Sequence, residues 1–448
     1  MWHGANASRS PRRLVTAELN CCYLNHRWKP PLTATPDELP LEETIDIRET
    51  ADVATVIAGA FANNRPLYPI GGGTALAWGL PAVRPGIGLM LAGLNRVIDY
   101  PARDMTITVE AGITMQALAQ QLATEGQQFP VDVPQAAEAT LGGVVATNTN
   151  GPRRFGLGTV RDYVIGIHAV DGRGTPFQGG GRVVKNVAGY DFCKLLTGSL
   201  GTLGVITQLT LKLKPIAEQR TIVACAVSGW QTAEHLLQAL IHSQTTPMAV
   251  ELISGPTWSS LTEWPTGGPE SVDGGLWLLA MLEGTEPEVR WMVNQLLGEW
   301  REQSIEQASE LTPEQRSVVW PALVEFPAGE GPLVVRASVV PSATTQMMAA
   351  FREVDATCEL QAHAGNGTVI ARFGAFPAEG LSRTLVSRLQ PLAAAADGNI
   401  VIMSNPGKSE MTPQSVWGGS DAPFQLMSAV KRNFDPKNLL NPGRFVYH

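Results

Sequence analysis

The first group of residues that could bind an anionic ligand forms a glycine turn. Gly71, Gly72, Gly73 and Thr74 directly follow the short apolar run 67–70. Consecutive glycines let the main chain approach a ligand closely and turn its N–H groups toward an anion, and Thr74 adds a hydroxyl group. The turn has no lysine and no GxGxxG spacing, which excludes a Walker A loop and a Rossmann fingerprint. The alternative interpretation is a tight surface turn.

A second stretch, 129–151, is dense in small side chains. These small residues are Ala139, Thr140, Gly142, Gly143, Ala146 and Thr147. Such a segment can lie flat against a planar ring and offer main-chain groups to the polar edge of that ring. The alternative is a Gly/Ala-rich loop at a packed interface.

A third stretch, 182–215, joins a polar loop to an alternating strand. The polar side chains of the loop are Arg182, Lys185, Asn186 and Tyr190. A turn at 201–204 then leads into the strand 205–214, where Ile206 is the apolar residue on an otherwise polar face. The alternative assigns the glycines to turn geometry, the polar residues to loop anchoring and the rest to the core.

Periodicity predicts the elements that position these stretches. Apolar residues recur at helical spacing over 50–63, which predicts an amphipathic helix before the strand 67–70. Strict alternation over 105–110 predicts a half-buried strand. Thr114 is placed to cap the helix that follows.

The pattern changes after Pro215, and we expect a domain boundary near residue 217. Strand-like and helix-like segments alternate there, which predicts a sheet backed by helices. The expected segments are 220–228, 231–243, 247–253, 276–282, 286–300, 332–339 and 342–352. The stretches 254–275 and 304–330 are rich in Gly, Pro and Ser and are expected to be long loops, flexible or facing a partner. Residues 1–40 are expected to form a disordered extension.

Composition excludes several classes of partner. The chain has 448 residues and a formal net charge of −8, an acidic balance that argues against nucleic acid or an anionic membrane as the main partner. Its five cysteines include no CxxC pair, so we expect no zinc site and no iron–sulfur cluster, and a reducing compartment. No run approaches the ~18 apolar residues that span a bilayer, so we expect no direct membrane insertion.

In this order the three stretches resemble the vanillyl-alcohol-oxidase family, also called the PCMH-type FAD-binding flavoproteins. The resemblance implies an α+β chain with a PCMH-type FAD-binding domain at 41–217 and an α+β cap domain, an antiparallel sheet backed by helices, at 218–430. A C-terminal segment, 431–448, would return to the first domain. The residues that the resemblance assigns to FAD are Ile70, Gly71, Gly72, Gly73, Thr74, Pro134, Thr140, Gly142, Gly143, Thr147, Gly204, Val205 and Ile206. Thr74 stands where some members carry a histidine bonded to FAD, so non-covalent FAD is expected.

Two further sequence motifs resemble those of the 2-hydroxy-acid dehydrogenase branch of this family. They are KNVAGYD at 185–191 and NFDPKNLLNPGR at 433–444. Catalytic members carry a word like HxGDGNLH, whose two histidines help bind a metal and the substrate. Here the matching word is HAGNGTVI: His363 matches the first histidine, but Ile370 replaces the second and can neither coordinate a metal nor accept a proton. No metal site is therefore expected. Lys185, Tyr190 and His363 are candidate catalytic residues, and a hydrogen-bonded structural role is the alternative for His363.

With this altered motif, the chain is similar to the E-type FAD-binding subunits of glycolate oxidase. That likeness implies a complex that oxidises glycolate, a small 2-hydroxy acid, to glyoxylate by hydride transfer to flavin. Its partners would be the D-type flavin subunit and the F-type iron–sulfur subunit of glycolate oxidase. The expected location is cytoplasmic. The alternative is peripheral attachment to the inner membrane through the partner subunits. Two alternatives stay open: a self-sufficient FAD-dependent D-2-hydroxy-acid dehydrogenase of the D-lactate type, and a non-enzymatic scaffold that has lost FAD.

Overall fold

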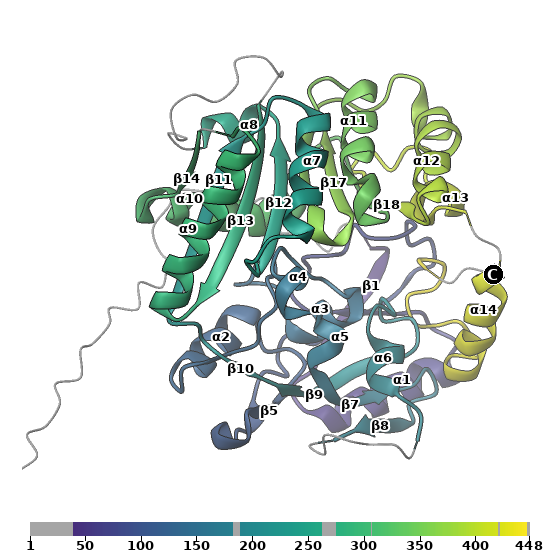
Figure 1. Cartoon of the computed structure of the whole chain (residues 1–448). Coiled ribbons are helices and arrows are strands. Elements are labelled where there is room, and N and C mark those ends of the chain that lie inside the picture. Colours follow the sequence, from purple (N-terminus) through teal and green to yellow (C-terminus); the bar gives the residue numbers. More distant parts are fainter. Residues whose placement is uncertain (1–38, 182–188, 262–274, 306, 420–421, 446–448) are drawn as a thin grey trace, which may run out of the picture.

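The chain folds as two units, which form the lower and upper halves of Figure 1. The computed structural model describes residues 39–181, 189–261, 275–305, 307–419 and 422–445. Leu39 and Pro40, which we included in the expected extension, are part of this fold, and Leu39 is buried. The remainder of that extension, residues 1–38, lies outside the described residues.

Short strands and short helices make up the first unit. Its strands are β1 (Leu41–Asp46), β2 (Leu67–Ile70), β3 (Gly86–Met90), β4 (Val97–Asp99), β5 (Thr106–Glu110), β6 (Gln127–Gln128), β7 (Val164–Val170), β8 (Pro176–Gly180), β9 (Val205–Lys212) and β10 (Lys214–Pro215). Its helices are α1 (Thr50–Ala62), α2 (Met115–Ala123), α3 (Leu141–Thr147), α4 (Arg154–Leu157), α5 (Val160–Tyr163) and α6 (Phe192–Leu196).

Two sheets of this unit position the predicted stretches. One is parallel, in the order β1-β3-β2, and the other is antiparallel, in the order β4-β5-β9-β7-β8. β2 ends at the glycine turn, whereas β9 begins directly after the turn at 201–204. Each sheet therefore delivers one of the stretches that were singled out from the sequence.

Local signals account for the helices that were expected here. The predicted helix over 50–63 is confirmed as α1, with Val53, Ile57 and Ala60 buried. Thr114 caps α2 as predicted, because its hydroxyl accepts a hydrogen bond from the amide of Ala117 at 3.2 Å.

The prediction that the strand over 105–110 is half-buried is wrong, because all residues of β5 are buried. Glu110 is only 1% exposed and accepts a hydrogen bond from Arg96 at 2.8 Å. The hydroxyl of Thr108 bonds that of Thr210 on β9 at 3.0 Å. Polar side chains can be buried where such partners exist, and alternation alone does not reveal the partners.

The second unit is built on one large antiparallel sheet. Its strands are β11 (Gln219–Ala226), β12 (Ala249–Ser254), β13 (Leu276–Gly284), β14 (Ala308–Glu310), β15 (Leu333–Ser338), β16 (Glu359–His363), β17 (Thr368–Phe373) and β18 (Asn399–Ser404). They pair in the order β14-β11-β13-β12-β16-β17-β15-β18. All the strand segments expected in this unit are confirmed.

Helices cover both faces of that sheet. They are α7 (Trp230–Ile241), α8 (Pro256–Ser260), α9 (Glu286–Glu302), α10 (Pro313–Glu325), α11 (Thr344–Val354), α12 (Gln390–Ala395) and α13 (Pro413–Trp417), with a π-helical segment over Ser382–Leu389. The last helix, α14 (Ala422–Phe434), lies instead beside the first unit, where Val430 and Phe434 pack on its core (Figure 1). Residues of α7, α9 and α11 share one core with the sheet, whereas residues of α8 and α10 share another. The predicted sheet backed by helices is confirmed, and so is the α+β fold class.

The expected long loop over 304–330 is wrong, because α10 and β14 lie within it. The amide of Thr312 donates to the side chain of Gln315 at 2.9 Å, and the amide of Gln315 donates to the Thr312 hydroxyl at 3.2 Å. This capping box, followed by a proline in the first turn, is a helix-start signal that the flanking composition concealed. Within 254–275, α8 is helical, and 262–274 lies outside the described residues.

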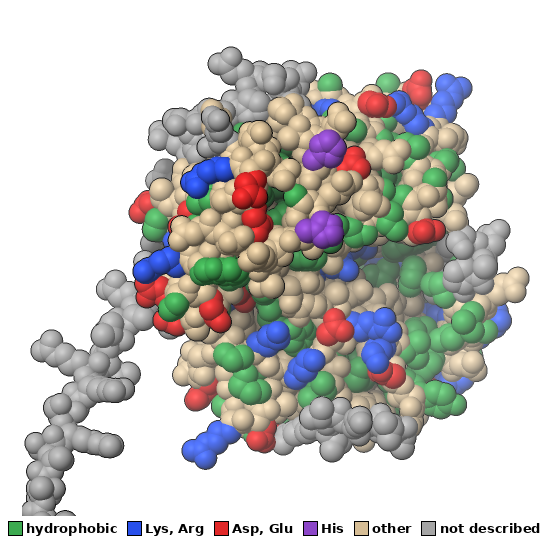
Figure 2. Space-filling model, viewed as in Figure 1, with side chains coloured by type: hydrophobic (Ala, Val, Ile, Leu, Met, Phe, Trp, Pro, Cys, Tyr) green, Lys and Arg blue, Asp and Glu red, His purple; other side chains and the backbone are tan. Residues whose placement is uncertain are grey.

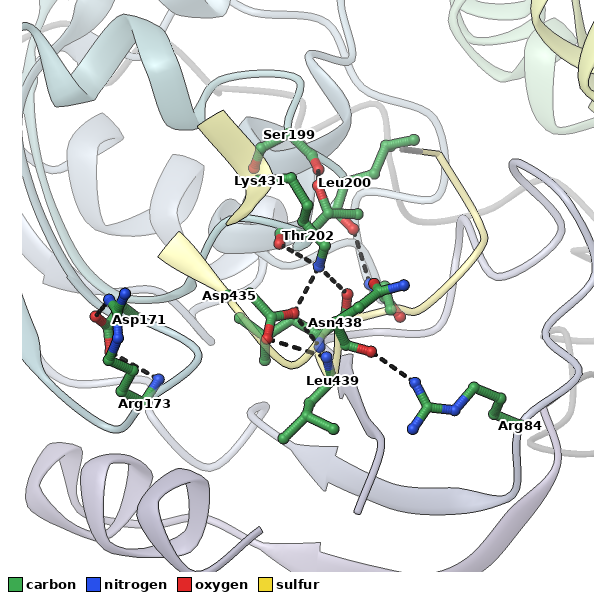
Figure 3. A network of polar contacts seen from close by, with 12 residues as sticks. Arg84, Asp171, Arg173, Ser199, Leu200, Thr202, Lys431, Asp435, Asn438 and Leu439 are labelled. Atoms are coloured by element: carbon green, nitrogen blue, oxygen red, sulfur yellow. Dashed lines mark hydrogen bonds and ion pairs between the residues drawn. The ribbon is translucent and has the colours of Figure 1, made fainter. Parts of the chain in front are cut away.

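A buried charge network that begins in α14 holds the end of the chain to the first unit (Figure 3). The ammonium group of Lys431 donates to the carbonyl oxygens of Thr202 at 2.8 Å and Leu440 at 2.9 Å, and to the carboxylate of Asp435 at 2.6 Å. Asp435 also accepts from the amide of Leu439 at 3.0 Å. Both charged side chains are almost fully buried. The network therefore fixes the C-terminal segment, 435–445, to the turn before β9.

We expect the Lys431→Met variant to lose about 3–5 kcal/mol of unfolding free energy, because the carboxylate of Asp435 would be left buried without its cation. Chemical denaturation followed by circular dichroism measures this loss. Arg432→Met is the matched control, because Arg432 is exposed and follows Lys431 on the same helix; its change should stay within about 0.5 kcal/mol. Equal losses in the two variants would contradict the role given to Lys431.

Candidate functional site

A cavity of about 180 Å³ lies between the two units. Figure 2 shows a recess between the two halves, with Lys and Arg side chains beside it. The structure brings every residue that was predicted to bind FAD into the lining of this one cavity. They are Ile70, Gly71, Gly72, Gly73, Thr74, Pro134, Thr140, Gly142, Gly143, Thr147, Gly204, Val205 and Ile206.

The glycine turn needs its glycines because it packs directly on the small-residue stretch. A Cβ atom on Gly71 would lie 2.1 Å from the Thr140 hydroxyl oxygen, and one on Gly72 would lie 1.7 Å from the Glu138 carbonyl oxygen. Gly73 has φ +77°, which favours glycine. Among the described residues, the amides of Gly71 to Thr74 donate to no other group, so these donors are available to a ligand.

The small-residue stretch forms one wall of the cavity through α3. Thr140 caps this helix, accepting a hydrogen bond from the amide of Gly143 at 3.4 Å. Gly142 packs on Ala111 of the first unit, where an added Cβ would approach the Ala111 Cβ at 2.8 Å. Because α3 has few long side chains on this side, a planar ring can approach its main chain.

The described lining of the cavity is basic. It contains Arg154, Arg336 and Arg444 and no Asp or Glu, although the whole chain carries a formal charge of −8. An anion is therefore the ligand class that this lining favours.

Arg336 is a buried cation without an anionic partner among the described residues. Burial, and next the charge of Arg154, lowers the pKa of Arg336 to about 10, so its guanidinium stays charged at neutral pH. Its Nε atom has no hydrogen-bond partner, and the same holds for Nε of Arg154. The guanidinium carbon of Arg336 lies 5.4 Å from the centroid of the Trp78 ring. Such a charge is costly to bury, and an anion bound in the cavity would offset the cost.

His363 lines the same cavity and is held by a buried carboxylate. Its Nδ1 atom lies 2.8 Å from Oε1 of Glu251, and both side chains are 2% exposed. Gln361 donates to the other oxygen of Glu251 at 2.8 Å. Burial raises the pKa of Glu251, an effect that the charge of His363 and the hydrogen bonds from His363 and Gln361 partly offset. With Nδ1 engaged, Nε2 is the ring nitrogen left for a ligand.

The other catalytic candidates do not join this site. Tyr190 is 85% exposed and does not line the cavity, so a role beside a ligand there is not supported. Lys185, with its neighbours Arg182 and Asn186, lies outside the described residues. Ile370, which replaces the second histidine of the family word, does line the cavity. Within the described part of the chain, no group of three or more His, Cys, Asp or Glu is placed to hold a metal ion.

Several lining residues were not predicted from the sequence. Arg336 carried a usable signal, because it is a charge inside the apolar strand LVVRASVV. Trp78 and Arg154 carried none, since each lies in a loop or short helix whose place is set by distant contacts. Arg444 belongs to the motif at 433–444, which indicated a branch of the family but no site residue.

These features fit FAD. Unpartnered amides in a glycine turn suit a pyrophosphate group, and the small side chains of α3 leave room for a planar ring system. The basic lining suits the negative charge of the dinucleotide.

Comparisons with known proteins agree with this geometry. Residues 44–179 match the model of a family described as FAD binding domain, and residues 216–445 match FAD linked oxidases, C-terminal domain. The cofactor is therefore FAD. The solved p-cresol methylhydroxylase with substrate bound shares the fold, with TM-score 0.63 and 17% identity over 90% of this chain and 88% of that chain.

Several curated relatives are oxidoreductases. Glycolate oxidase subunit GlcD of Bacillus subtilis (strain 168) is 25% identical over 92% of this chain and 90% of its own length. D-lactate dehydrogenase of Anaerostipes hadrus is 28% identical over 91% of this chain and 90% of its own length. Glycolate oxidase subunit GlcE of Escherichia coli (strain K12) is 40% identical, but over only 27% of this chain and 34% of its own length. In the described part of the chain, every helix is too short or too polar to cross a membrane.

Proposed function

Because this chain belongs to the FAD linked oxidases, we propose that it oxidises a small 2-hydroxy acid, with glycolate as the first substrate to test. That it is an FAD-linked oxidoreductase of the glycolate oxidase and D-lactate dehydrogenase type follows from its family and relatives. The choice of a 2-hydroxy acid rests on one observation. Arg336 and Arg154 are unpartnered at Nε in the cavity that the FAD-binding stretches share.

Two guanidinium groups at one end of a cavity recognise a carboxylate by charge and by paired N–H donors. Arg336 is held over the ring of Trp78, which limits its motion. Bound there, a substrate carboxylate would receive the charge-assisted hydrogen bonds that both guanidiniums lack at Nε. The carbon that bears the hydroxyl group would then be oriented toward the wall of α3.

His363 is the proposed proton acceptor. Bound FAD supplies the hydride acceptor, so the protein must take the hydroxyl proton. In this proposal the Nδ1–H group of His363 donates a hydrogen bond to the carboxylate of Glu251, which leaves Nε2 with its lone pair free to take a proton. When Nε2 takes the substrate proton, the same carboxylate stabilises the imidazolium that forms.

Non-covalent attachment of FAD is part of the proposal. Thr74 stands in the glycine turn, and the described lining of the cavity contains no Cys and no Tyr. The one histidine in that described lining, His363, is engaged by Glu251.

The proposed setting is a glycolate-oxidase-type complex, in which this chain is a flavin subunit beside a D-type flavin subunit and an F-type iron–sulfur subunit. The local similarity to a GlcE subunit supports this setting. The second candidate is a self-sufficient D-2-hydroxy-acid dehydrogenase, and the pairing of His363 with Glu251 favours it. One chain then carries both a carboxylate site and a proton acceptor. Turnover of a dye by the purified single chain would separate the two.

We expect glycolate or D-lactate to bleach the flavin absorbance of the purified, FAD-loaded chain under anaerobic conditions. Arg336→Met should weaken this reduction by about 10–100-fold through a higher half-saturating substrate concentration, because a charge-assisted pair is worth about 1.5–3 kcal/mol. Arg388→Met is the control, because Arg388 is exposed and pairs with Glu353. If 2-hydroxy acids leave the flavin oxidised, the proposed function is wrong.

His363→Gln should lower the rate of flavin reduction by about 10²–10⁴-fold while the half-saturating concentration changes little, because it removes a general base and not a carboxylate contact. His235→Gln on α7 is a matched control that lies outside the cavity lining. Equal rates of flavin reduction in His363→Gln and the wild-type chain would show that His363 is only structural.

A further inference from the structure

The C-terminal segment joins the two loops that flank the cavity. The amide of Leu67 donates to the carbonyl of Leu439 at 2.8 Å, and the amide of Asn441 donates to the carbonyl of Leu67 at 2.9 Å. The side chain of Asn441 donates to the carbonyl of Leu200 at 2.7 Å. The segment is thus bonded both to β2, which ends at the glycine turn, and to the turn before β9.

Arg444 is carried to the cavity by this segment. Its guanidinium donates to the carbonyl oxygens of Leu76 and Trp78, directly after the glycine turn. Its own carbonyl accepts hydrogen bonds from the amide of Leu80 at 3.0 Å and from the indole of Trp417 at 3.2 Å. The residue is 8% exposed and lines the cavity together with the turn.

We propose that Arg444 is a cofactor-binding residue whose positive charge faces the FAD pyrophosphate. The inference rests on the proposed binding of FAD by the glycine turn. Main-chain amides supply directed donors but no net charge, whereas a pyrophosphate is an anion that loses its hydration when it is bound. A buried guanidinium held on the same loop supplies the missing charge.

The three cavity arginines then divide between two anionic groups. Arg336 and Arg154 interact with each other electrostatically, and Arg336 lies over the ring of Trp78. Arg444 lies on the main chain of Leu76 and Trp78, beside the glycine turn. One pair would serve a substrate carboxylate, and Arg444 would serve the cofactor phosphates.

The experiment measures the dissociation constant of FAD for the apoprotein by quenching of flavin fluorescence, at low and high salt. Arg444→Gln keeps a hydrogen-bond donor but removes the charge, and Arg444→Lys keeps the charge. We expect Arg444→Gln to weaken FAD binding by about 10–100-fold and Arg444→Lys to retain most of the affinity. The dissociation constant should depend less steeply on salt in Arg444→Gln than in the wild type. Riboflavin, which has no phosphate, should bind wild type and Arg444→Gln alike.

Arg84→Gln is the matched control. Arg84 also donates to the C-terminal segment, at the carbonyl of Asn438 at 2.8 Å, but it does not line the cavity. It should leave the FAD salt dependence unchanged, even if it lowers the melting temperature.

Three results would overturn the inference and leave the proposed function standing. If Arg444→Gln and Arg444→Lys weaken FAD binding equally, Arg444 only shapes the loop. The same conclusion follows if Arg444→Gln weakens riboflavin binding as much as FAD binding. If Arg444→Gln binds FAD like wild type, the charge has no role, although the proposed function survives. A wild-type chain that binds no FAD would instead remove the proposed function and this inference together.

Discussion

The buried ammonium of Lys431 is the constraint on which the site depends. It donates to the carbonyl of Thr202 in the turn before β9, and to the carbonyl of Leu440 and the carboxylate of Asp435 in the C-terminal segment. Burial lowers the pKa of Lys431, and the carboxylate of Asp435 offsets part of that effect. Because the ammonium must keep all its partners to remain buried, the geometry of these segments is tightly specified.

That geometry has a direct consequence for the cavity. The fixed C-terminal segment holds Asn441 against the turn at 200 and Arg444 against the loop after the glycine turn. The two sheets of the first unit are thereby joined at the edge where both present ligand-facing main chain. From the second unit come Arg336 and the His363–Glu251 pair, so the proposed substrate site exists only where the two units meet.

Most residues of the FAD-binding stretches could be predicted from sequence, but few residues of the proposed substrate site could. Three continuous sequence motifs line one cavity: the glycine turn, the small-residue stretch and residues 204–206. Their residue types reflect the close approach of the main chain to a ligand. Trp78, Arg154 and Arg444 reach it through long-range contacts that no local period encodes. Tyr190, which was a candidate because of its sequence motif, is exposed and does not line the cavity. The helix α10 was missed because proline and polar residues at its start resembled a loop.

The central claim is that free amides of the glycine turn and the wall of α3 bind one FAD. Amide hydrogen exchange of the chain with and without FAD tests it most directly, because it reports on the same N–H groups. We expect slower exchange at 71–74, 140–147 and 204–206 when FAD is bound. Tight binding of FAD with unchanged exchange in these three segments would contradict it.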